Sequence, residues 1–191
     1  WHPLMTLEDS TFVNDMIKSM ISMSVENDFF PMWAFASSET HTMIGYHGAS
    51  VLTDAYNKGI RGYDAQLALE ELIKSSGRGV RGRNLYREKG YLPANRFKES
   101  VSRTLEYAYD DFALARFAGA LGKEDTFKIL MERSKNYRHV IDTAIGYVRG
   151  RWADGSWYEP FDLNDTQALY ITEGTPFQYT WYVPHDVYGL M

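Results

Sequence analysis

The sequence predicts a mainly α fold, and two observations support this prediction. Apolar residues recur at the i, i+3, i+4 spacing of an amphipathic helix in several segments, whereas alternating strand patterns are sparse. The helical segments are separated by long loops rich in polar and aromatic residues, which is typical of an array of helical hairpins. A chain of 191 residues matches one ordinary domain.

Each predicted helix has an apolar face, and several have clear end signals. Asp9 or Ser10 is a suitable N-cap for the first helix and Asp64 for the third, while Gly59 is a suitable stop after the second. The fourth helix has the strongest helical period and carries small residues that favour close packing. The predicted helices span Phe12–Met23, Ala49–Gly59, Asp64–Ser76, Ser100–Leu121 and Lys123–Tyr137.

Three segments between the helices are predicted to be loops. Residues 28–46 lack a helical period and form a long polar and aromatic stretch, so we expect a functional loop in which Trp33 is either a sugar platform or a core aromatic. Residues 77–83 look superficially like a phosphate-binding loop. Because they lack the Gly-Lys-Ser/Thr ending and follow no strand, we expect a solvated loop. Residues 148–165 favour a hairpin or loop.

Polar residues on or beside the helices are weaker candidates for function. Glu106 and Asp110 are four residues apart and therefore share a helical face, and Asp111 lies beside them. Two carboxylates on one face either are exposed to solvent or point into a polar cavity. The residues by themselves favour exposure to solvent. His47 and Asp54 lie near the start of the second helix. A histidine there more often packs or caps than reacts, and no His-x-x-x-His pair suggests a metal.

The stretch from Tyr170 to Met191 has the composition of a carbohydrate pocket. Glu173 lies in a turn broken by Gly and Pro, and Gln178, His185 and Asp186 follow it among aromatic residues. Aromatic faces stack on sugar rings, while amide, imidazole and carboxylate groups bind hydroxyls. A buried aromatic turn whose polar groups satisfy one another remains an equal alternative at this point.

The same stretch carries a resemblance to a known family. The run E-G-T-P-F-Q-Y-T-W-Y-V-P-H-D-V-Y-G-L resembles the signature of the calcium-dependent exo-α-mannosidases, family 92 of the glycoside hydrolases. Other segments resemble that family's catalytic domain in the same order, so the resemblance covers nearly the whole chain. They are H-P-L, P-M-W, M-I-G-Y-H-G-A-S-V-L-T-D-A-Y-N-K-G-I, V-S-R-T-L-E-Y-A-Y-D-D and D-G-S-W-Y-E-P-F-D.

The resemblance implies a fold and an activity. The fold would be part of an (α/α)6 toroid with long active-site loops, and residues 1–191 would be a portion of one catalytic domain whose N- and C-terminal parts are absent. The activity would be that of an exo-acting inverting α-mannosidase that removes terminal mannose from mannose-rich N-glycans or mannans. Thr175, Pro176 and Phe177 depart from the Asn, Ala and Trp that are usual in the family.

Inversion needs a carboxylic acid on the leaving oxygen and a carboxylate base that activates water. The resemblance assigns the acid to Glu173, and an aromatic turn would favour the protonated form by desolvation. The family's base is an Asp in a motif downstream of this chain, so we expect the fragment alone to be inactive. We also expect calcium as the cofactor, with ligands largely beyond Met191. The candidate substrate-binding residues are Trp33, His47, Gln178, His185 and Asp186.

Composition limits the partners. The chain has no cysteine, a net charge of -5 and no cluster of basic residues, so nucleic acid is not an expected partner. No apolar run approaches the roughly 20 residues that cross a bilayer. We expect a mannose-containing oligosaccharide as the partner, a secreted, periplasmic or cell-surface location, and self-association through exposed helix faces. A noncatalytic carbohydrate-binding or scaffold module, or another (α/α)6 glycosidase, remains the alternative.

Overall fold

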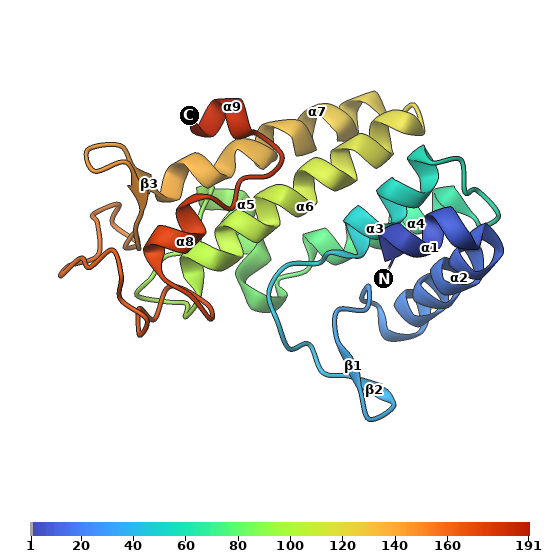
Figure 1. The fold of residues 1–191 in the computed structure, drawn as a ribbon, viewed down its shortest axis with the longest axis horizontal. Helices are drawn as coiled ribbons and strands as arrows, with labels where there is room; N and C mark the ends of the chain where they lie inside the picture. Colours follow the sequence, from blue (N-terminus) through green and yellow to red (C-terminus); the bar gives the residue numbers. More distant parts are fainter. Residues whose placement is uncertain (1) are drawn as a thin grey trace. The chain divides into compact units, whose positions relative to one another are not determined.

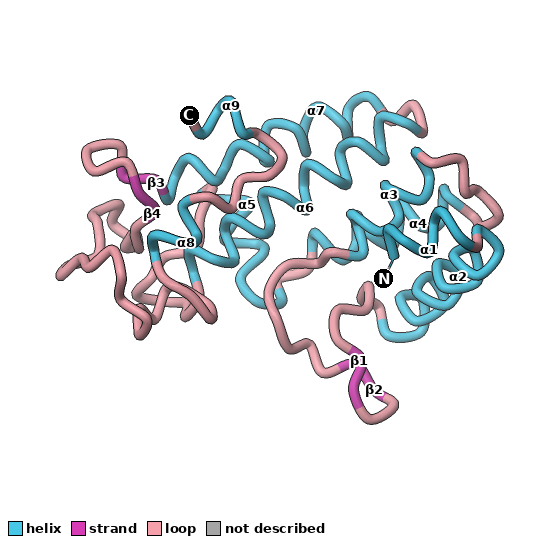
Figure 2. The backbone as a smooth tube through the Cα atoms, in the orientation of Figure 1, coloured by secondary structure: helices cyan, strands magenta, loops and turns pink. Residues whose placement is uncertain are grey.

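The computed structural model describes residues 2–191 and is mainly α, as predicted (Figure 2). The chain divides into two compact units. Unit 1 contains the residues up to Arg78 together with Asp110–Met131, and unit 2 contains Gly79–Tyr109 together with Glu132–Met191. Helix α6, Ser100–Ala120, therefore supplies residues to both units.

Unit 1 is built from helices and one short hairpin (Figure 1). The hairpin is antiparallel and pairs Ala34 with Glu39 and Phe35 with Ser38. The elements of unit 1 are α1 (His2–Glu8), α2 (Ser10–Asn27), β1 (Ala34–Phe35), β2 (Ser38–Glu39), α3 (Gly48–Asn57), α4 (Ala65–Gly77), the carboxyl-terminal half of α6, and most of α7 (Glu124–Arg133).

The predicted end signals of the first three predicted helices are confirmed. Asp9 caps α2 by accepting a 2.9 Å hydrogen bond from the amide of Phe12, and Asp64 caps α4 by accepting one of 2.9 Å from Leu67. Gly59 follows α3 with a φ of +85°, the left-handed conformation that glycine adopts at low cost. The sequence did not predict α1.

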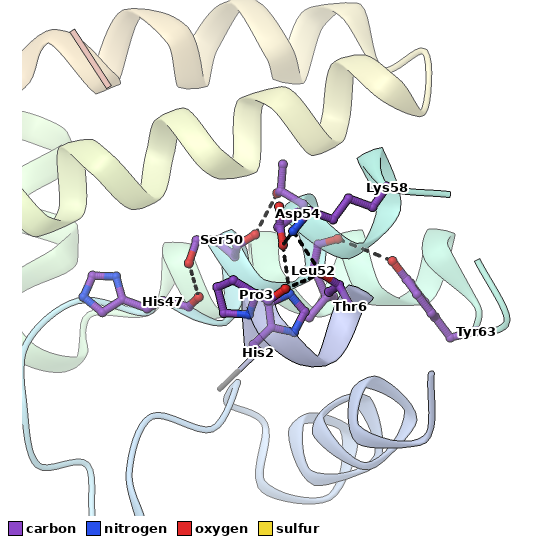
Figure 3. Close-up of polar contacts among 11 residues, drawn as sticks. His2, Pro3, Thr6, His47, Ser50, Leu52, Asp54, Lys58 and Tyr63 are labelled. Atoms are coloured by element: carbon purple, nitrogen blue, oxygen red, sulfur yellow. Dashed lines mark hydrogen bonds and ion pairs between the residues drawn. The ribbon is translucent and has the colours of Figure 1, made fainter. Parts of the chain in front are cut away.

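A polar cluster joins α1 to α3 (Figure 3). Asp54 lies 3.3 Å from the Nε2 atom of His2 and 2.7 Å from the Nζ atom of Lys58, and Lys58 also donates to the hydroxyl of Thr6. Burial lowers the pKa of His2, which favours the neutral imidazole in the folded chain. His47 lies apart from this cluster, at the amino-terminal end of α3 (Figure 3). Asp54 therefore has a structural role.

Unit 2 is more irregular. Its elements are η1 (Val80–Gly82, a 3₁₀ helix), α5 (Arg83–Lys89), the first half of α6, η2 (Ser134–Val140, a 3₁₀ helix), β3 (Ile141–Asp142), β4 (Tyr147–Val148), α8 (Pro176–Thr180) and α9 (Val187–Leu190). Its core is an apolar cluster that brings the C-terminal stretch onto α6 and η2. This cluster contains Tyr91, Val101, Leu105, Ala108, Tyr137, Val140, Val148, Ala168, Tyr170, Ile171 and Val183.

Several predicted boundaries need correction. The predicted helix Lys123–Tyr137 is α7, which ends at Arg133, and the chain then tightens into the 3₁₀ helix η2. The prediction of a hairpin or loop at residues 148–165 is confirmed, because this segment has no helix and an isolated antiparallel bridge joins Arg151 to Trp157; the β3–β4 hairpin just before it was not predicted. The solvated-loop prediction for residues 77–83 is wrong at its end, because Arg83 begins α5 and is only 1% exposed.

The prediction that the carboxylates of α6 face solvent is also wrong. Asp110 and Asp111 are fully buried and Glu106 is 8% exposed. Helical spacing alone cannot distinguish a solvated face from a buried polar one, because that depends on which groups pack against the helix.

None of the helices in residues 2–191 is long and apolar enough to cross a membrane.

Candidate active site

Glu173, the predicted acid, lies in the turn that precedes α8 in unit 2. Its side chain is exposed, and its backbone has a φ of 49°, a left-handed conformation that costs a non-glycine residue about 1–2 kcal/mol. The next residue, Gly174, lies against α8, since a Cβ there would come within 3.1 Å of the Oε1 atom of Gln178. The described residues therefore do not desolvate Glu173, contrary to expectation.

Gln178 holds the turn together. Its amide oxygen accepts a 2.9 Å hydrogen bond from the backbone of Thr175, and the Thr175 hydroxyl accepts one of 3.3 Å from the backbone of Gln178. This capping box, with Pro176 in the first turn, begins α8 directly after Glu173. Thr175 and Pro176, which depart from the family's usual residues, are thus good helix-starting residues.

His185 and Asp186 are held by η2. The Nε2 atom of His185 lies 2.9 Å from the carbonyl oxygen of Ser134, and because a carbonyl oxygen only accepts, this nitrogen carries the proton. Asp186 accepts a 2.7 Å hydrogen bond from the hydroxyl of Tyr137 and one of 3.0 Å from the backbone of Gly189. The Tyr137 hydrogen bond is the main cause of a lowered pKa for Asp186.

Carboxylates gather around Tyr179 and Tyr182, close to the turn of Glu173. The hydroxyl of Tyr182 donates to Glu106 over 3.3 Å. Burial is the main cause of a raised pKa for Tyr179, and the negative charges of Glu106 and Glu173 raise this pKa further. A hydrogen bond with Ser102 acts in the opposite direction and lowers the pKa. Glu106, which the sequence placed in solvent, therefore belongs to the surroundings of the predicted acid.

Aromatic side chains next to this turn are open to solvent. Phe177 is 42% exposed and Trp181 is 63% exposed, and their rings meet edge to face with centroids 6.2 Å apart. Tyr147 approaches Phe177 with a centroid distance of 6.4 Å. Exposed rings of this kind can stack on a sugar, so the composition argument for a carbohydrate pocket has a physical counterpart in unit 2.

Trp33 and His47 lie in unit 1. Trp33 is 51% exposed beside the β1–β2 hairpin, so it is not a core aromatic; its backbone amide donates to the carboxylate of Glu39. His47 is the N-cap residue of α3, but its side chain makes no cap hydrogen bond. Its Nδ1 atom lies 2.7 Å from the Oδ1 atom of Asp110, which is fully buried. The sequence missed this pair because its members lie 63 positions apart in the chain, and no local signal joins them.

The acids of the described residues do not fit a calcium site. Calcium takes about six to eight oxygen ligands, and residues 2–191 contain no group of three or more His, Asp or Glu side chains that could hold a metal. Asp110 and Asp111 accept hydrogen bonds from Tyr46. Asp162 and Asp165 accept from the backbone of their own turns. We therefore derive no catalytic step through a metal in this chain.

Comparison with known proteins identifies the family. The model of the glycosyl hydrolase family 92 catalytic domain matches residues 1–191. The chain therefore belongs to glycosyl hydrolase family 92, within its catalytic domain. Together with the helical structure, this confirms the predicted fold class, mainly α and part of an (α/α)6 toroid.

Solved structures are similar over almost the whole chain. The α-mannosidase BT3965 of Bacteroides thetaiotaomicron, in complex with mannoimidazole, is 38% identical with a TM-score of 0.94, over 99% of this chain and 26% of that protein. The inverting mannosidase BT2199 of the same organism is 35% identical with a TM-score of 0.89, over 99% and 26% respectively.

A curated relative extends the comparison to a fungus. An uncharacterized secreted glycosidase of Arthroderma benhamiae is 27% identical over 78% of this chain and 24% of its own length. The chain thus spans about a quarter of each of these relatives. The family assignment applies to residues 1–191, and the activity of the whole protein is the subject of a proposal.

Proposed function

We propose that the protein containing this chain is an exo-acting inverting α-mannosidase that removes terminal mannose from mannose-rich N-glycans or mannans. The observation that carries the proposal is the similarity of the whole chain, at 38% identity, to an α-mannosidase solved with mannoimidazole. The inverting outcome is supported by the likeness to BT2199, an inverting mannosidase.

Glu173 is the proposed general acid. Its side chain is exposed, so the oxygen of a leaving group can reach it, and it lies beside open aromatic rings on α8. The base that activates water in an inverting enzyme must lie about 6.5–9.5 Å from the acid, and we assign it to a part of the protein outside residues 1–191. Desolvation that favours the protonated acid would come from the substrate and from those other parts.

The test is Glu173→Gln in the full-length protein. We expect hydrolysis of mannobiose to fall roughly 10²–10⁴-fold, while mannosides with a leaving group that needs no proton are largely spared. Glu132→Gln is the matched control, because Glu132 is an exposed acid of unit 2 that pairs only with Lys135 in the described contacts. Equal losses on both classes of substrate would rule out the acid role.

The stereochemical outcome is tested separately. Proton NMR during hydrolysis of an α-mannoside should show the β-anomer of mannose first, followed by mutarotation to the equilibrium mixture. First appearance of the α-anomer would exclude inversion. Binding of a mannose oligosaccharide without any release of mannose would favour the noncatalytic carbohydrate-binding module instead.

Calcium remains a proposal for the full-length protein only. Because residues 2–191 offer no cluster of acidic ligands, its oxygen ligands would come largely from elsewhere in the protein. We expect a chelator to reduce mannosidase activity and calcium to restore it. Calorimetric titration of the 191-residue chain should show no tight stoichiometric site, and such a site would refute the proposed placement of the ligands.

Location and self-association complete the proposal. The likeness to a secreted glycosidase supports an extracellular, periplasmic or cell-surface location, which fractionation of the source cells would test.

Apolar side chains on α1 and α2 are open to solvent, with Leu4 50%, Leu7 77% and Phe12 50% exposed. We expect the isolated chain to associate through these faces, and a monodisperse monomer in light scattering would contradict this.

A further inference from the structure

The β1–β2 hairpin of unit 1 carries two exposed aromatic rings. Trp33 is 51% exposed and Phe35 is 69% exposed, and the hairpin extends away from the helices of its unit (Figure 1). The amide of Thr40 donates to the carbonyl oxygen of Trp33 over 3.2 Å, so the pairing of β1 with β2 continues by one residue before Ala34. Because residues two apart on a strand point to the same side, both rings belong to one face of the hairpin.

The same face of the hairpin carries two hydroxyl groups. Ser38 lies opposite Phe35 and Thr40 lies opposite Trp33. Directly opposite residues of an antiparallel pair share a face, and both Ser38 and Thr40 are exposed. Glu39, the acid of this hairpin, alternates with them and belongs to the other face. An uncharged face with two rings and two hydroxyls fits a sugar, because rings stack on its C–H groups and hydroxyls bind its hydroxyls.

Glu39 holds the backbone that carries Trp33. Its Oε2 atom accepts a 2.7 Å hydrogen bond from the amide of Met32, and its Oε1 atom accepts one of 2.7 Å from the amide of His41. The amide of Trp33 donates to both oxygens, over 3.0 and 3.1 Å. Burial acts to raise the pKa of Glu39, but these backbone hydrogen bonds together outweigh it and lower the pKa. The hydroxyl of Thr40 donates to the carbonyl oxygen of Trp33 over 2.9 Å, so the peptide groups on both sides of Trp33 are held.

The turn of the hairpin has an uncommon backbone conformation. Its two central residues, Ala36 and Ser37, have φ values of 51° and 67°, and a two-residue turn of type I′ needs a positive φ at both positions. Asparagine and glycine are usual there, and other residues adopt a positive φ only at a cost in free energy. Such strain persists only where surrounding contacts maintain it. The hydrogen bonds of Glu39 are suited to that role, so we expect a well-ordered hairpin.

We propose that the face of the β1–β2 hairpin with Trp33 and Phe35 is a platform on which a sugar ring of the substrate stacks, and that Glu39 is the positioning residue of this platform. The identity of the sugar, an α-linked mannose oligosaccharide, rests on the proposed function. Binding to the hairpin is measured in a variant that does not turn over, so the platform can fail while the hydrolytic activity stands.

Fluorine-19 NMR of the full-length protein, labelled with 5-fluorotryptophan, tests the platform. The Trp33 signal is assigned from its absence in Trp33→Phe, and Glu173→Gln prevents turnover. We expect α-1,2-, α-1,3- or α-1,6-linked mannobiose to shift this signal with saturation, and Phe35→Ala to weaken that binding about 3- to 10-fold. A Trp33 signal that none of the three disaccharides moves would overturn the platform. So would a signal that does not respond to exchange of H₂O for D₂O, because another part of the protein would then cover the ring.

Kinetics separate a platform from a structural contact. Trp33→Ala should raise KM for the mannobiose that is hydrolysed about 3- to 10-fold and leave kcat nearly unchanged, because stacking of this kind holds substrate and transition state equally. A lower kcat with an unchanged KM would contradict the platform. An active mannosidase whose KM is native in Trp33→Ala would also overturn it, and would leave the proposed function intact.

Glu39→Gln tests the positioning role. Glutamine has one acceptor oxygen, so its amide nitrogen must face the backbone amide of Met32 or of His41, where two donors oppose each other. We expect a broadened Trp33 fluorine signal and a KM raised about 3- to 10-fold, with no further effect on KM once Trp33 is alanine. Glu26→Gln is the matched control, because Glu26 is an exposed acid on α2, and it should leave both quantities unchanged. An unaltered Trp33 signal in Glu39→Gln, or an equal KM effect in the Trp33→Ala background, would show that Glu39 does not act through Trp33.

Discussion

The two acids of the C-terminal stretch of unit 2, Glu173 and Asp186, have opposite surroundings. Asp186 accepts hydrogen bonds from Tyr137 and Gly189, and its pKa is lowered. Glu173 is exposed and has a left-handed backbone. Glu173 and Asp186 lie thirteen positions apart in one motif, and the sequence does not distinguish their surroundings. The comparison teaches that two acids of one motif can differ in their surroundings: the hydrogen bonds of Asp186 tie it to the fold, whereas Glu173 is open to solvent on a strained turn.

The largest expected effect separates activity from stability at Glu173. If Glu173 is the general acid, as we propose, Glu173→Gly in the full-length protein should reduce hydrolysis of mannobiose roughly 10²–10⁴-fold. Glycine adopts a left-handed backbone freely, so the free energy of unfolding of the chain should stay the same or rise by up to about 1 kcal/mol. Kinetic assays and urea unfolding measure the two quantities. A large loss of stability would show that the side chain of Glu173 is structural.

The next effect concerns Asp186 and falls mainly on stability. Asp186→Ala removes the cap of α9 and leaves the hydroxyl proton of the buried Tyr137 without its acceptor. We expect the free energy of unfolding to fall by about 1–3 kcal/mol. Leu169→Ala is a suitable control, because Leu169 is 62% exposed. An Asp186 variant of native stability that had lost activity would reverse the comparison.

A smaller effect is expected from the partner of Asp186. Tyr137→Phe removes one hydroxyl and should cost about 0.5–1.5 kcal/mol of unfolding free energy, measured by urea unfolding. Because this hydrogen bond is the main cause of the lowered pKa of Asp186, the pKa should rise toward its ordinary value in the variant. Carbon-13 NMR of the carboxylate follows that change. No movement of the pKa would mean that other groups hold the charge.

The smallest effect is the pH dependence that Asp186 contributes. Its folded pKa lies below the ordinary value of 3.8, so its contribution to stability is present above that value and is lost as pH falls through the folded pKa. Native chain and Asp186→Asn should therefore converge in stability in acid and diverge toward neutral pH. Urea unfolding at several pH values measures the difference. A constant offset between the two at all pH values would contradict the assignment.

The sequence by itself determined the helical class, the ends of α3, α4 and α6 to within about two residues, and the family. Local signals were sufficient because a cap such as Asp9 acts on an amide three residues away, and because apolar spacing reflects the helix period. The turn at Glu173 was also predicted from its neighbouring Gly and Pro, whereas the capping box of Thr175 and Gln178 that begins α8 was not predicted.

Tertiary structure alone decided which polar side chains are buried and which partners they bind. Asp110 is buried because Tyr46 and His47 reach it from 64 and 63 positions away, and no helical period contains that distance. His185 and Asp186 look like sugar-binding groups in the motif, and the fold adds contacts that the motif does not reveal: Ser134 meets the Nε2 atom of His185, and Tyr137 donates to Asp186. A polar group's function depends on which partners fold onto it, and those partners come from remote parts of the chain.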